Sequence, residues 1–360
     1  MHDFQRLTIT EVWRELPDAI SVALAVPPAL REAYRFKPGQ HLAFRVKLDG
    51  EEVRRTYSIC SGPGDEHLRI AIKRVAGGHF SHWANDTLKA GQTLEALPPA
   101  GRFILPESDG KRRHIVALAA GVGITPIIAM VKHALMAEPR TEVTLFYGNR
   151  SAGTILFRDE LEDLKDRHIA RFALLHVLSR SAADAPLLQG RIDGAKMKAF
   201  AQKLLRVEDV AHVFLCGPGT MIKEARNAFI ELGLPRERIH HEFFAPGGGA
   251  YQKKPETALP ETPSSPGQSA EVVAILDGVQ HRFAVPPGEH VVDAAQKAGV
   301  RVPYSCKGGM CCTCRCKLLE GNVTMDVNYS LEPWEIESGY VLACQSRPLT
   351  AHVRLDFDQT

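Results

Sequence analysis

Four cysteines near the C-terminal end of this 360-residue sequence have a spacing suited to redox chemistry. Four residues separate Cys306 from Cys311, two separate Cys311 from Cys314, and Cys344 follows thirty positions after Cys314. This is the plant-type spacing for a [2Fe–2S] cluster, and thiolates are the soft ligands that such clusters prefer. The spacing therefore predicts that these four residues are metal ligands and that the chain carries single electrons.

Two other uses of the cysteines fit the sequence less well. A four-cysteine zinc site usually pairs two Cys-x2-Cys motifs, whereas Cys344 stands alone. A disulfide framework needs an oxidising compartment, and Cys60 and Cys216 are isolated from the other six cysteines. Cys312 and Cys316 fall outside the cluster spacing, and we expect them to be core thiols.

A glycine-rich turn in the middle of the chain has the pattern of a nucleotide-binding turn. The apolar segment 115–119 is followed by Gly121, Gly123, Thr125 and Pro126. Glycines let the backbone approach a pyrophosphate, and free amides at a helix N-terminus attract its charge. We expect Thr125 to be the N-cap and Pro126 the first helical residue. Because the third glycine of the dinucleotide fingerprint is missing, a plain strand-to-helix turn is the alternative.

Two arginines indicate which dinucleotide is used. Arg150 follows the strand expected at 143–147, and Ser179 and Arg180 follow the strand expected at 174–178. An NAD site commonly has an acidic residue in this region, whereas an arginine suits the 2′-phosphate of NADPH. The sequence therefore favours NADPH, with ordinary surface arginines as the alternative.

A third strand end carries residues that would border a nicotinamide. Cys216, Gly217 and Pro218 follow the strand expected at 213–215. Ligands bind beyond the carboxyl ends of the strands in open α/β sheets. The alternative is again a simple turn between a strand and a helix.

The first part of the chain holds residues suited to a flavin. Arg55, Tyr57 and Ser58 lie in one strand-like segment, and Lys73 and the loop 77–81 follow. They could supply an aromatic face for the flavin ring, a donor near its redox-active nitrogen, and cations and amides for its phosphates. A second phosphate favours FAD over FMN. Each element alone could be an ordinary strand or turn. The loop residues proposed for the diphosphate are Gly78, His79, Phe80 and Ser81.

The segments between these motifs predict a protein of several domains. Residues 1–107 contain short alternating strands broken by Gly and Pro, which favour an antiparallel β-barrel that binds FAD. Residues 108–245 alternate strands with helices, as an α/β domain with a parallel sheet does. Residues 246–269 are rich in Gly, Pro and Ser and predict a flexible linker. Residues 270–360 then form a small α+β domain of the β-grasp type, which carries the cluster.

Composition narrows the choice of partners and compartment. The 44 basic and 42 acidic residues nearly balance, so the sequence lacks the excess of positive charge expected of a protein that binds nucleic acid or an anionic membrane. We see no secretory signal in the first residues. The apolar run 115–131 contains Gly and Pro and is too short to span a bilayer. We therefore expect a cytoplasmic protein without nucleic-acid or membrane partners, in a compartment where reduced thiols can bind iron.

Together these motifs resemble the ferredoxin–NADP reductase family. The order of a flavin domain, a nucleotide domain and a plant-type ferredoxin is that of the reductase components of bacterial multicomponent oxygenases. The similarity is narrowest to the reductase subunits of phenylacetyl-CoA epoxidases. It rests on the segments RFKPGQHL, RRTYSICS, IAIKRVAGGHFS, GVGITP, YGNR, LSR and SCKGGMCCTCRC.

The resemblance implies an NAD(P)H-dependent oxidoreductase that acts in electron transport. Electrons would pass from NADPH to FAD, then to the [2Fe–2S] cluster, and finally to a diiron oxygenase. The narrow similarity implies the epoxidase of phenylacetate degradation, a route of aromatic catabolism. The alternative is the reductase of another aromatic-ring or steroid hydroxylase, since these proteins share the layout.

The resemblance also implies roles for individual residues. Arg55, Tyr57 and Ser58 would contact the flavin, and the loop from Gly78 to Ser81 its diphosphate. Glu242 matches the acidic residue of a Glu-x-Phe ending, which makes Phe244 the aromatic near the flavin and leaves Phe243 to the core. The residues implied at the site of hydride transfer are Ser58, Thr125, Cys216, Glu242 and Phe244.

Overall fold

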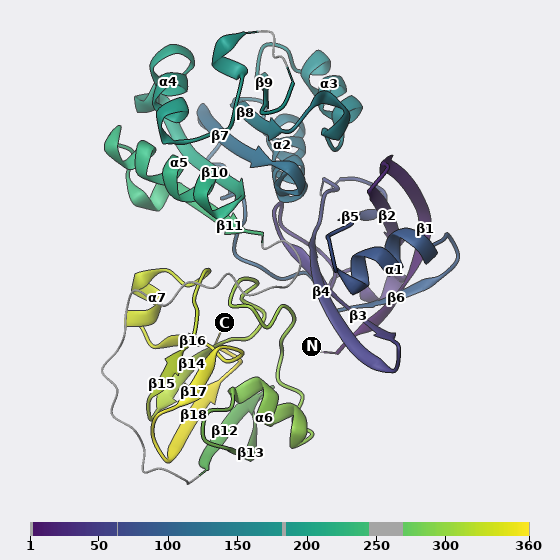
Figure 1. Ribbon diagram of the computed structural model, residues 1–360, viewed down its shortest axis with the longest axis vertical. Helices are drawn as coiled ribbons and strands as arrows, with labels where there is room; N and C mark the ends of the chain where they lie inside the picture. Colours follow the sequence, from purple (N-terminus) through teal and green to yellow (C-terminus); the bar gives the residue numbers. More distant parts are fainter. Residues whose placement is uncertain (1–2, 63, 182–184, 245–268, 360) are drawn as a thin grey trace. The chain divides into compact units, whose positions relative to one another are not determined.

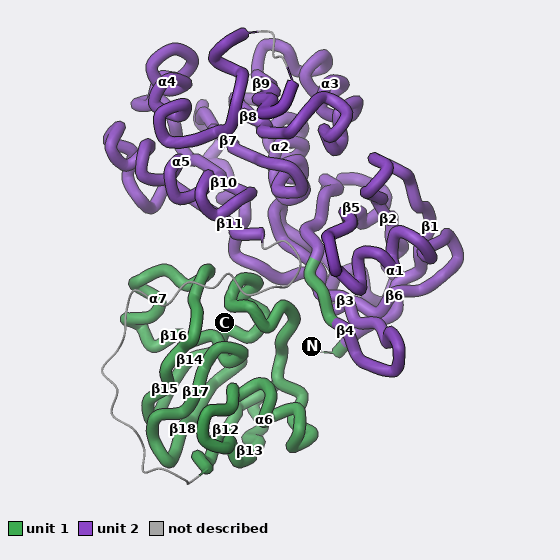
Figure 2. The backbone as a smooth tube through the Cα atoms, in the orientation of Figure 1, with its two compact units in different colours: residues 1–3, 54–56, 248–360 green, residues 4–53, 57–247 purple. Residues whose placement is uncertain are grey.

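The computed structural model describes residues 3–62, 64–181, 185–244 and 269–359. Most of the linker predicted at 246–269 lies outside these ranges, and the domain boundaries stay predictions. The chain forms two compact units (Figure 2). Among the described residues, the smaller unit consists of those after this segment together with residues 3 and 54–56, and the larger unit of all the others. No helix in the described ranges is long and apolar enough to cross a membrane.

The first part of the larger unit is a six-stranded sheet that closes on itself. Its strand order is β4-β3-β6-β1-β2-β5, and an isolated bridge between Ile59 and Ile70 joins the end of β4 to β5. Side chains alternate as in a half-buried strand, so that Leu7 and Ile9 of β1 are buried and the residues between and around them are not. The elements are β1 (Gln5–Leu16), β2 (Ala19–Ala25), β3 (His41–Leu48), β4 (Glu51–Ser58), β5 (Leu68–Lys73), α1 (His79–Thr87) and β6 (Thr93–Ala96).

The second part of the larger unit is a five-stranded parallel sheet between helices (Figure 1). Its order is β11-β10-β7-β8-β9, so the chain reverses direction across the sheet between β7 and β10. The apolar run noted in the sequence is a strand and a helix, and residues 115–119 in the middle of β7 are buried, as expected of a strand covered on both faces. The elements are β7 (Arg113–Ala120), α2 (Ile124–Ala137), β8 (Thr141–Asn149), α3 (Arg158–Arg167), β9 (Phe172–Leu178), α4 (Gly194–Leu204), β10 (Val210–Gly217), α5 (Gly219–Glu231) and β11 (Ile239–Phe243).

Short 3₁₀ turns connect several of these elements. The one that bears on the site is η2 (Gly121–Gly123), which joins β7 directly to α2. The others are η1 (Pro28–Leu30), η3 (Ala152–Thr154), η4 (Pro186–Leu188), η5 (Val207–Asp209) and η6 (Arg236–Arg238).

The smaller unit is a mixed sheet with its own core. The strand order is β13-β12-β18-β14-β16, in which β12 and β18 are parallel and the other pairs antiparallel. The apolar face of α6, with Val291, Val292 and Ala295, packs into this core. The elements are β12 (Ala270–Leu276), β13 (Val279–Val285), α6 (Val291–Lys297), β14 (Arg315–Glu320), β15 (Val323–Met325), α7 (Pro333–Glu337), β16 (Tyr340–Leu342), β17 (Ser346–Pro348) and β18 (His352–Asp356).

The barrel and the parallel-sheet domain are joined by apolar packing. One cluster of buried side chains combines Ala19, Cys60 and Ala71 of the barrel with residues of α2 and β7, such as Ile127 and Ala117. Because apolar surface buried from both sides stabilises their contact, these two domains form one packed body. This explains why they fall in the same compact unit.

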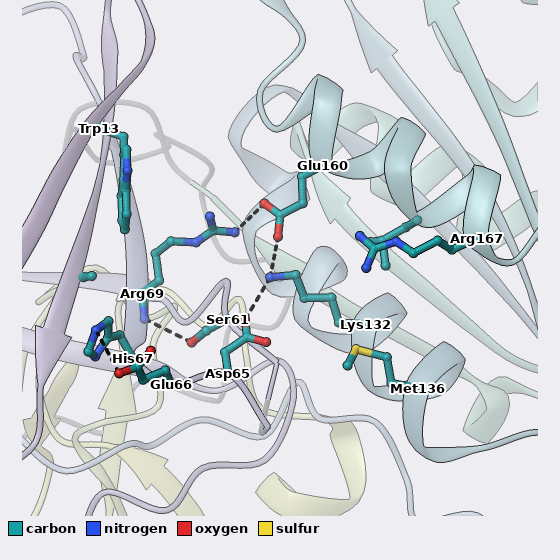
Figure 3. Close-up of a pocket in the computed structure, with 12 residues that line it drawn as sticks. Trp13, Ser61, Asp65, Glu66, His67, Arg69, Lys132, Met136, Glu160 and Arg167 are labelled. Carbon is teal, nitrogen blue, oxygen red and sulfur yellow. Dashed lines mark hydrogen bonds and ion pairs between the residues drawn. The ribbon is translucent and has the colours of Figure 1, made fainter.

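A network of buried charges crosses the same contact (Figure 3). The side chain of Lys132 on α2 is only 8% exposed, and its Nζ lies 2.9 Å from Oδ2 of Asp65 in the loop before β5. Lys132 also pairs with Glu160 of α3, which in turn pairs with Arg69 of β5. A buried lysine needs such partners because desolvating an unpaired charge is costly. We call Lys132, Asp65, Glu160 and Arg69 the charge clasp.

Removing the lysine should weaken this contact. In Lys132→Met, the partly buried Asp65 and Glu160 lose their shared cation, and we expect unfolding of the larger unit to need about 2 kcal/mol less free energy. Lys165→Met is the matched control, since Lys165 pairs with Glu162 at 40% exposure on both sides and should change stability by less than about 0.5 kcal/mol. Urea unfolding measures both variants. Equal stability of the two would show that the clasp does not hold the domains together.

Candidate functional site

The four cysteines predicted as ligands lie in two thiol pairs in the smaller unit. Cys306 and Cys311 are hydrogen-bonded to each other through their side chains, and so are Cys314 and Cys344. In the described ranges, no three or more His, Cys, Asp or Glu side chains surround a position for a single metal ion. Two thiols for each of two irons is the arrangement that a four-cysteine [2Fe–2S] cluster needs. The donor set therefore fits such a cluster.

Backbone amides favour the thiolate form in this loop. The hydrogen bond with Cys311, followed by those with the amides of Gly308 and Met310, lowers the pKa of Cys306 to about 5 in spite of its burial. The Gly308 amide nitrogen lies 3.3 Å from Sγ of Cys306. Gly309 has a φ of +71°, and a Cβ there would lie 2.9 Å from the carbonyl oxygen of Val327. Only glycine suits this position, and the tight bend aims amides at sulfur.

Gln345 is a site residue that sequence reasoning did not find. Its Nε2 donates to the carbonyl oxygen of Lys307 at 2.8 Å and lies 3.7 Å from Sγ of Cys344. The side chain therefore ties the loop of the first three cysteines to the segment that carries the fourth. Its position directly after Cys344 is the only sequence signal, because the partner is 38 residues away.

The two remaining cysteines of the tail lie in or against the core. Cys316 on β14 is fully buried, and burial raises its pKa far above the ordinary value. Cys312 is partly buried against the same apolar cluster, in a left-handed conformation with a φ of 54°. Both positions agree with the expectation of core thiols.

The glycine-rich turn lies where the strand order of the parallel sheet reverses. A Cβ on Gly123 would overlap the carbonyl oxygen of Cys216, and one on Gly217 would lie 3.1 Å from Cβ of Ala120. Gly121 has a φ of 54°, which favours glycine. The ends of β7 and β10 therefore approach each other closely because Gly123 and Gly217 have no side chains. Such a switch point is where open α/β sheets bind their ligands.

The expected helix start at this turn was wrong by two residues. The N-cap is Gly123, not Thr125, and Pro126 is the third helical residue rather than the first. The 3₁₀ turn η2 already winds the chain, so the helix continues from it. The Thr125 hydroxyl donates back to the carbonyl oxygen of Val122 at 3.0 Å. Pro126 costs nothing here, because first-turn amides have no acceptor within the helix, and no side chain caps this turn.

The residues expected to select the dinucleotide lie side by side. The amide of Arg180 donates to the carbonyl oxygen of Arg150 at 2.8 Å, and the amide of Ser179 donates to that of Asn149 at 3.0 Å. Both arginine side chains are exposed at the carboxyl ends of β8 and β9. Two guanidinium groups thus flank one edge of the sheet, where a phosphate can be bound by a planar fork.

Pro218, at the third strand end, is the N-cap of α5 and comes directly after the Cys216–Gly217 turn.

Part of the flavin set comes together around Tyr57. Its ring centroid lies 5.5 Å from that of Phe80, and Ser58 next to it is buried. The hydroxyl of Ser81 donates to the carbonyl oxygen of Gly78 at 2.9 Å and fixes the loop that starts α1. This helix begins at His79 with neither a side-chain cap nor an acidic residue in its first turn. Its free amides therefore suit a diphosphate.

The two cations of the flavin set are placed differently. Nζ of Lys73 lies 3.4 Å from Oδ2 of Asp18, so a carboxylate of the barrel already balances its charge. Arg55 is exposed, and its Nη1 donates to the backbone of Arg54. Of the two, Arg55 is the better candidate for a phosphate.

The acidic residue of the last strand is buried beside the switch point. Glu242 on β11 is paired in register with Cys216 on β10. Burial raises the pKa of Glu242 to about 8, and burial together with this carboxyl raises the pKa of the Cys216 thiol. Phe244 packs against the cluster that contains α2, whereas Phe243 packs on the opposite face near α5. Both side chains are partly buried, and the assignment of Phe244 rather than Phe243 to the flavin stays a prediction.

Family models match the three domains of the chain in the predicted order. They are an oxidoreductase FAD-binding domain over residues 8–104, an oxidoreductase NAD-binding domain over residues 117–227, and a 2Fe-2S iron-sulfur cluster binding domain over residues 274–349. The cofactors expected from the sequence are therefore confirmed by class: FAD, a nicotinamide dinucleotide and a [2Fe–2S] cluster.

Relatives match over the full length. The chain is 41% identical to one of the subunits of 1,2-phenylacetyl-CoA epoxidase from Escherichia coli (strain K12), over 99% of each chain. It is 34% identical to the ferredoxin reductase component of 3-ketosteroid-9-alpha-monooxygenase from Rhodococcus rhodochrous, over 98% of this chain and 96% of the relative.

Solved structures confirm the predicted fold class. Phthalate dioxygenase reductase matches with a TM-score of 0.59 at 24% identity, over 98% of both chains. An intact type IV self-sufficient cytochrome P450 monooxygenase matches with a TM-score of 0.67 at 21% identity, over 98% of this chain and 41% of the larger one. The antiparallel barrel, the parallel α/β domain and the C-terminal α+β domain are therefore an established arrangement.

Serine substitutions test the cluster ligands. Replacing Cys306, Cys311, Cys314 or Cys344 should abolish the visible absorption and the electron paramagnetic signal of the [2Fe–2S] cluster, because each iron needs both of its thiolates. Flavin should stay bound, since Tyr57, Ser58 and the loop 78–81 lie in the other unit. Cys316→Ser and Cys312→Ser are the controls that should keep the cluster. A cluster lost in Cys312→Ser but kept in Cys311→Ser would overturn the assignment.

Proposed function

Because this chain belongs to the family of FAD- and [2Fe–2S]-containing reductase components of oxygenase systems, we propose that it delivers electrons from NADPH to a phenylacetyl-CoA epoxidase. The observation that carries this proposal is the full-length similarity to a subunit of such an enzyme, which exceeds that to the steroid monooxygenase reductase. The acceptor would be the diiron oxygenase subunits. We place the reaction in the cytoplasm, where thiols stay reduced.

The chain would bind and orient three redox groups: a nicotinamide, a flavin and an iron–sulfur cluster. When bound, the nicotinamide, the flavin and the cluster supply hydride and single-electron transfer. Thr125 and Cys216 are buried at the switch point and would border the nicotinamide, where their low exposure keeps water out. Glu242 would hold a proton there, and Phe244 would offer an aromatic edge.

The flavin would be bound mainly by the barrel. Tyr57 would offer a ring face, with the 1% exposed Phe80 supporting it from the core, and the buried hydroxyl of Ser58 would offer a hydrogen bond to the ring system. The uncapped amides of His79, Phe80 and Ser81 would receive the diphosphate, with Arg55 as the cation.

The cluster would be bound by the two thiol pairs of the smaller unit. The partner thiol and nearby backbone amides lower the pKa of one thiol in each pair, Cys306 and Cys344, whereas the partner thiol and burial raise the pKa of Cys311 and Cys314. Residues 246–269 join the two units in one chain. A covalent link of this length keeps one unit at high effective concentration near the other, so that every flavin would have its own cluster.

NADPH rather than NADH should be the better donor. Arg150 and Arg180 are exposed and adjacent, and losing one charge-assisted phosphate contact should cost about 1.5–3 kcal/mol. We expect Arg150→Ala and Arg180→Ala to raise the KM for NADPH by one to two decades, roughly, and to leave that for NADH nearly unchanged. Steady-state reduction of cytochrome c measures both. Arg167→Ala, on α3, is a control that should alter neither constant.

The acceptor is tested by reconstitution. The reductase is combined with the oxygenase subunits of a phenylacetyl-CoA epoxidase or with the oxygenase of a 3-ketosteroid 9α-monooxygenase, and substrate-dependent NADPH oxidation is measured. We expect coupled oxidation with phenylacetyl-CoA and only background with the steroid system. The reverse result would assign the chain to a steroid hydroxylase.

A further inference from the structure

A histidine of the barrel faces the buried glutamate of the nucleotide domain. His41 is the first residue of β3, and its Nδ1 lies 3.9 Å from Oε1 of Glu242 on β11. The two side chains are 4% and 13% exposed. Among the described residues, neither Nε2 of His41 nor Oε2 of Glu242 has a hydrogen-bond partner. Buried polar atoms without partners are rare, and each calls for an explanation.

Both side chains are held in place by their surroundings. The backbone of His41 exchanges two hydrogen bonds with Ala100, at 2.9 and 3.0 Å. Gly101 follows with a φ of +110°, and a Cβ there would lie 2.8 Å from Nδ1 of His41. Glycine therefore leaves room for the imidazole at this position. Glu242 is fixed by its parallel pairing with Cys216.

The environment of the pair keeps it neutral around pH 7. Burial lowers the pKa of His41 to about 4 and raises that of Glu242 to about 8. The carboxyl of Glu242 and burial both raise the pKa of the neighbouring Cys216 thiol, which therefore stays neutral. One proton on Glu242, or the same proton passed to His41, gives the pair a net charge of zero. Two such groups titrate as a unit rather than separately.

We propose that His41 is the positioning residue for Glu242 and that the two side chains share one transferable proton across the contact between the barrel and the nucleotide domain. In the transfer, the O–H bond of Glu242 breaks and an N–H bond forms at Nδ1 of His41. No net charge appears in the buried site. This inference rests on the proposed nicotinamide site beside Cys216, where loss of a hydride would leave a positive charge on the nicotinamide, so that the charge state of a nearby buried carboxyl would affect the rate.

The separation fits a contact that tightens during the reaction. At 3.9 Å the two atoms are beyond hydrogen-bonding distance. Catalytic hydrogen bonds are often long before substrate binds and shorten in the complex. While Glu242 holds the proton, Nδ1 of the neutral imidazole would accept from its hydroxyl. When Glu242 has lost the proton to solvent, the other neutral tautomer would donate from Nδ1, because Nε2 has no partner among the described residues that fixes the tautomer. The bond to the charged carboxylate is the stronger of the two, so His41 should make ionisation easier. A variant that lacks this donor should therefore retain the proton of Glu242 to higher pH.

Infrared difference spectroscopy of the intact protein against pH measures the proton directly. The carbonyl stretch of a protonated buried carboxyl should disappear with a midpoint near the pKa of about 8 given for Glu242, and it should be absent in Glu242→Gln. We expect His41→Phe to raise the midpoint by about one unit, the effect of losing one neutral hydrogen bond. His41→Gln retains an N–H donor and should restore the wild-type midpoint.

A matched histidine provides the control. His67 lies at the same 3.9 Å from a carboxylate, that of Glu66, but Glu66 is 89% exposed. His67→Phe should leave the infrared midpoint unchanged. If His41→Phe behaves like His67→Phe, His41 has no influence on the proton of Glu242 and the proposal is wrong.

A kinetic readout separates a positioning role from a structural one. Anaerobic stopped-flow measurement of flavin reduction by NADPH should show a change in rate at the infrared midpoint, and His41→Phe should move both together. A rate profile that stays fixed while the infrared midpoint moves would overturn the link to the reaction. These measurements need the reductase alone, so they are independent of which oxygenase accepts the electrons.

Discussion

The packed contact between the barrel and the parallel-sheet domain is the constraint on which the rest of the larger unit depends. Apolar side chains of both domains form one cluster, and a lysine that is 8% exposed is neutralised by carboxylates from both sides. Such a contact tolerates little sliding, because moving one domain would expose apolar surface and separate buried charges. It therefore fixes the glycine-rich turn of one domain relative to the flavin loop of the other, and it brings His41 to Glu242.

The smaller unit has to bring four thiols close enough to share a cluster, although the fourth comes from a segment thirty residues away. Gln345 and the tight bend at Gly309 hold the two segments together. Its apolar core is separate from those of the larger unit, which suits an electron-carrying domain that folds by itself.

The features that could be predicted from the sequence are local ones. Cysteine spacing, strand alternation and the order of the motifs indicated three domains and their cofactors, because each depends on neighbouring residues. Thr125 was misplaced because a 3₁₀ turn before the helix leaves no signal of its own. The pairing of Lys73 with Asp18, and the meeting of His41 with Glu242, depend on how distant segments pack. No pattern within one segment carries that information, and Glu242 itself was found only through the resemblance to a family.

Anaerobic titration with NADPH, followed by absorbance and electron paramagnetic resonance on the same sample, tests most directly that one chain joins a two-electron flavin to a one-electron cluster. We expect the purified protein to take up about three electrons per chain, and Cys344→Ser about two, with the paramagnetic cluster signal lost only in the variant. Uptake of about two electrons by the wild type, without a cluster signal, would contradict the account.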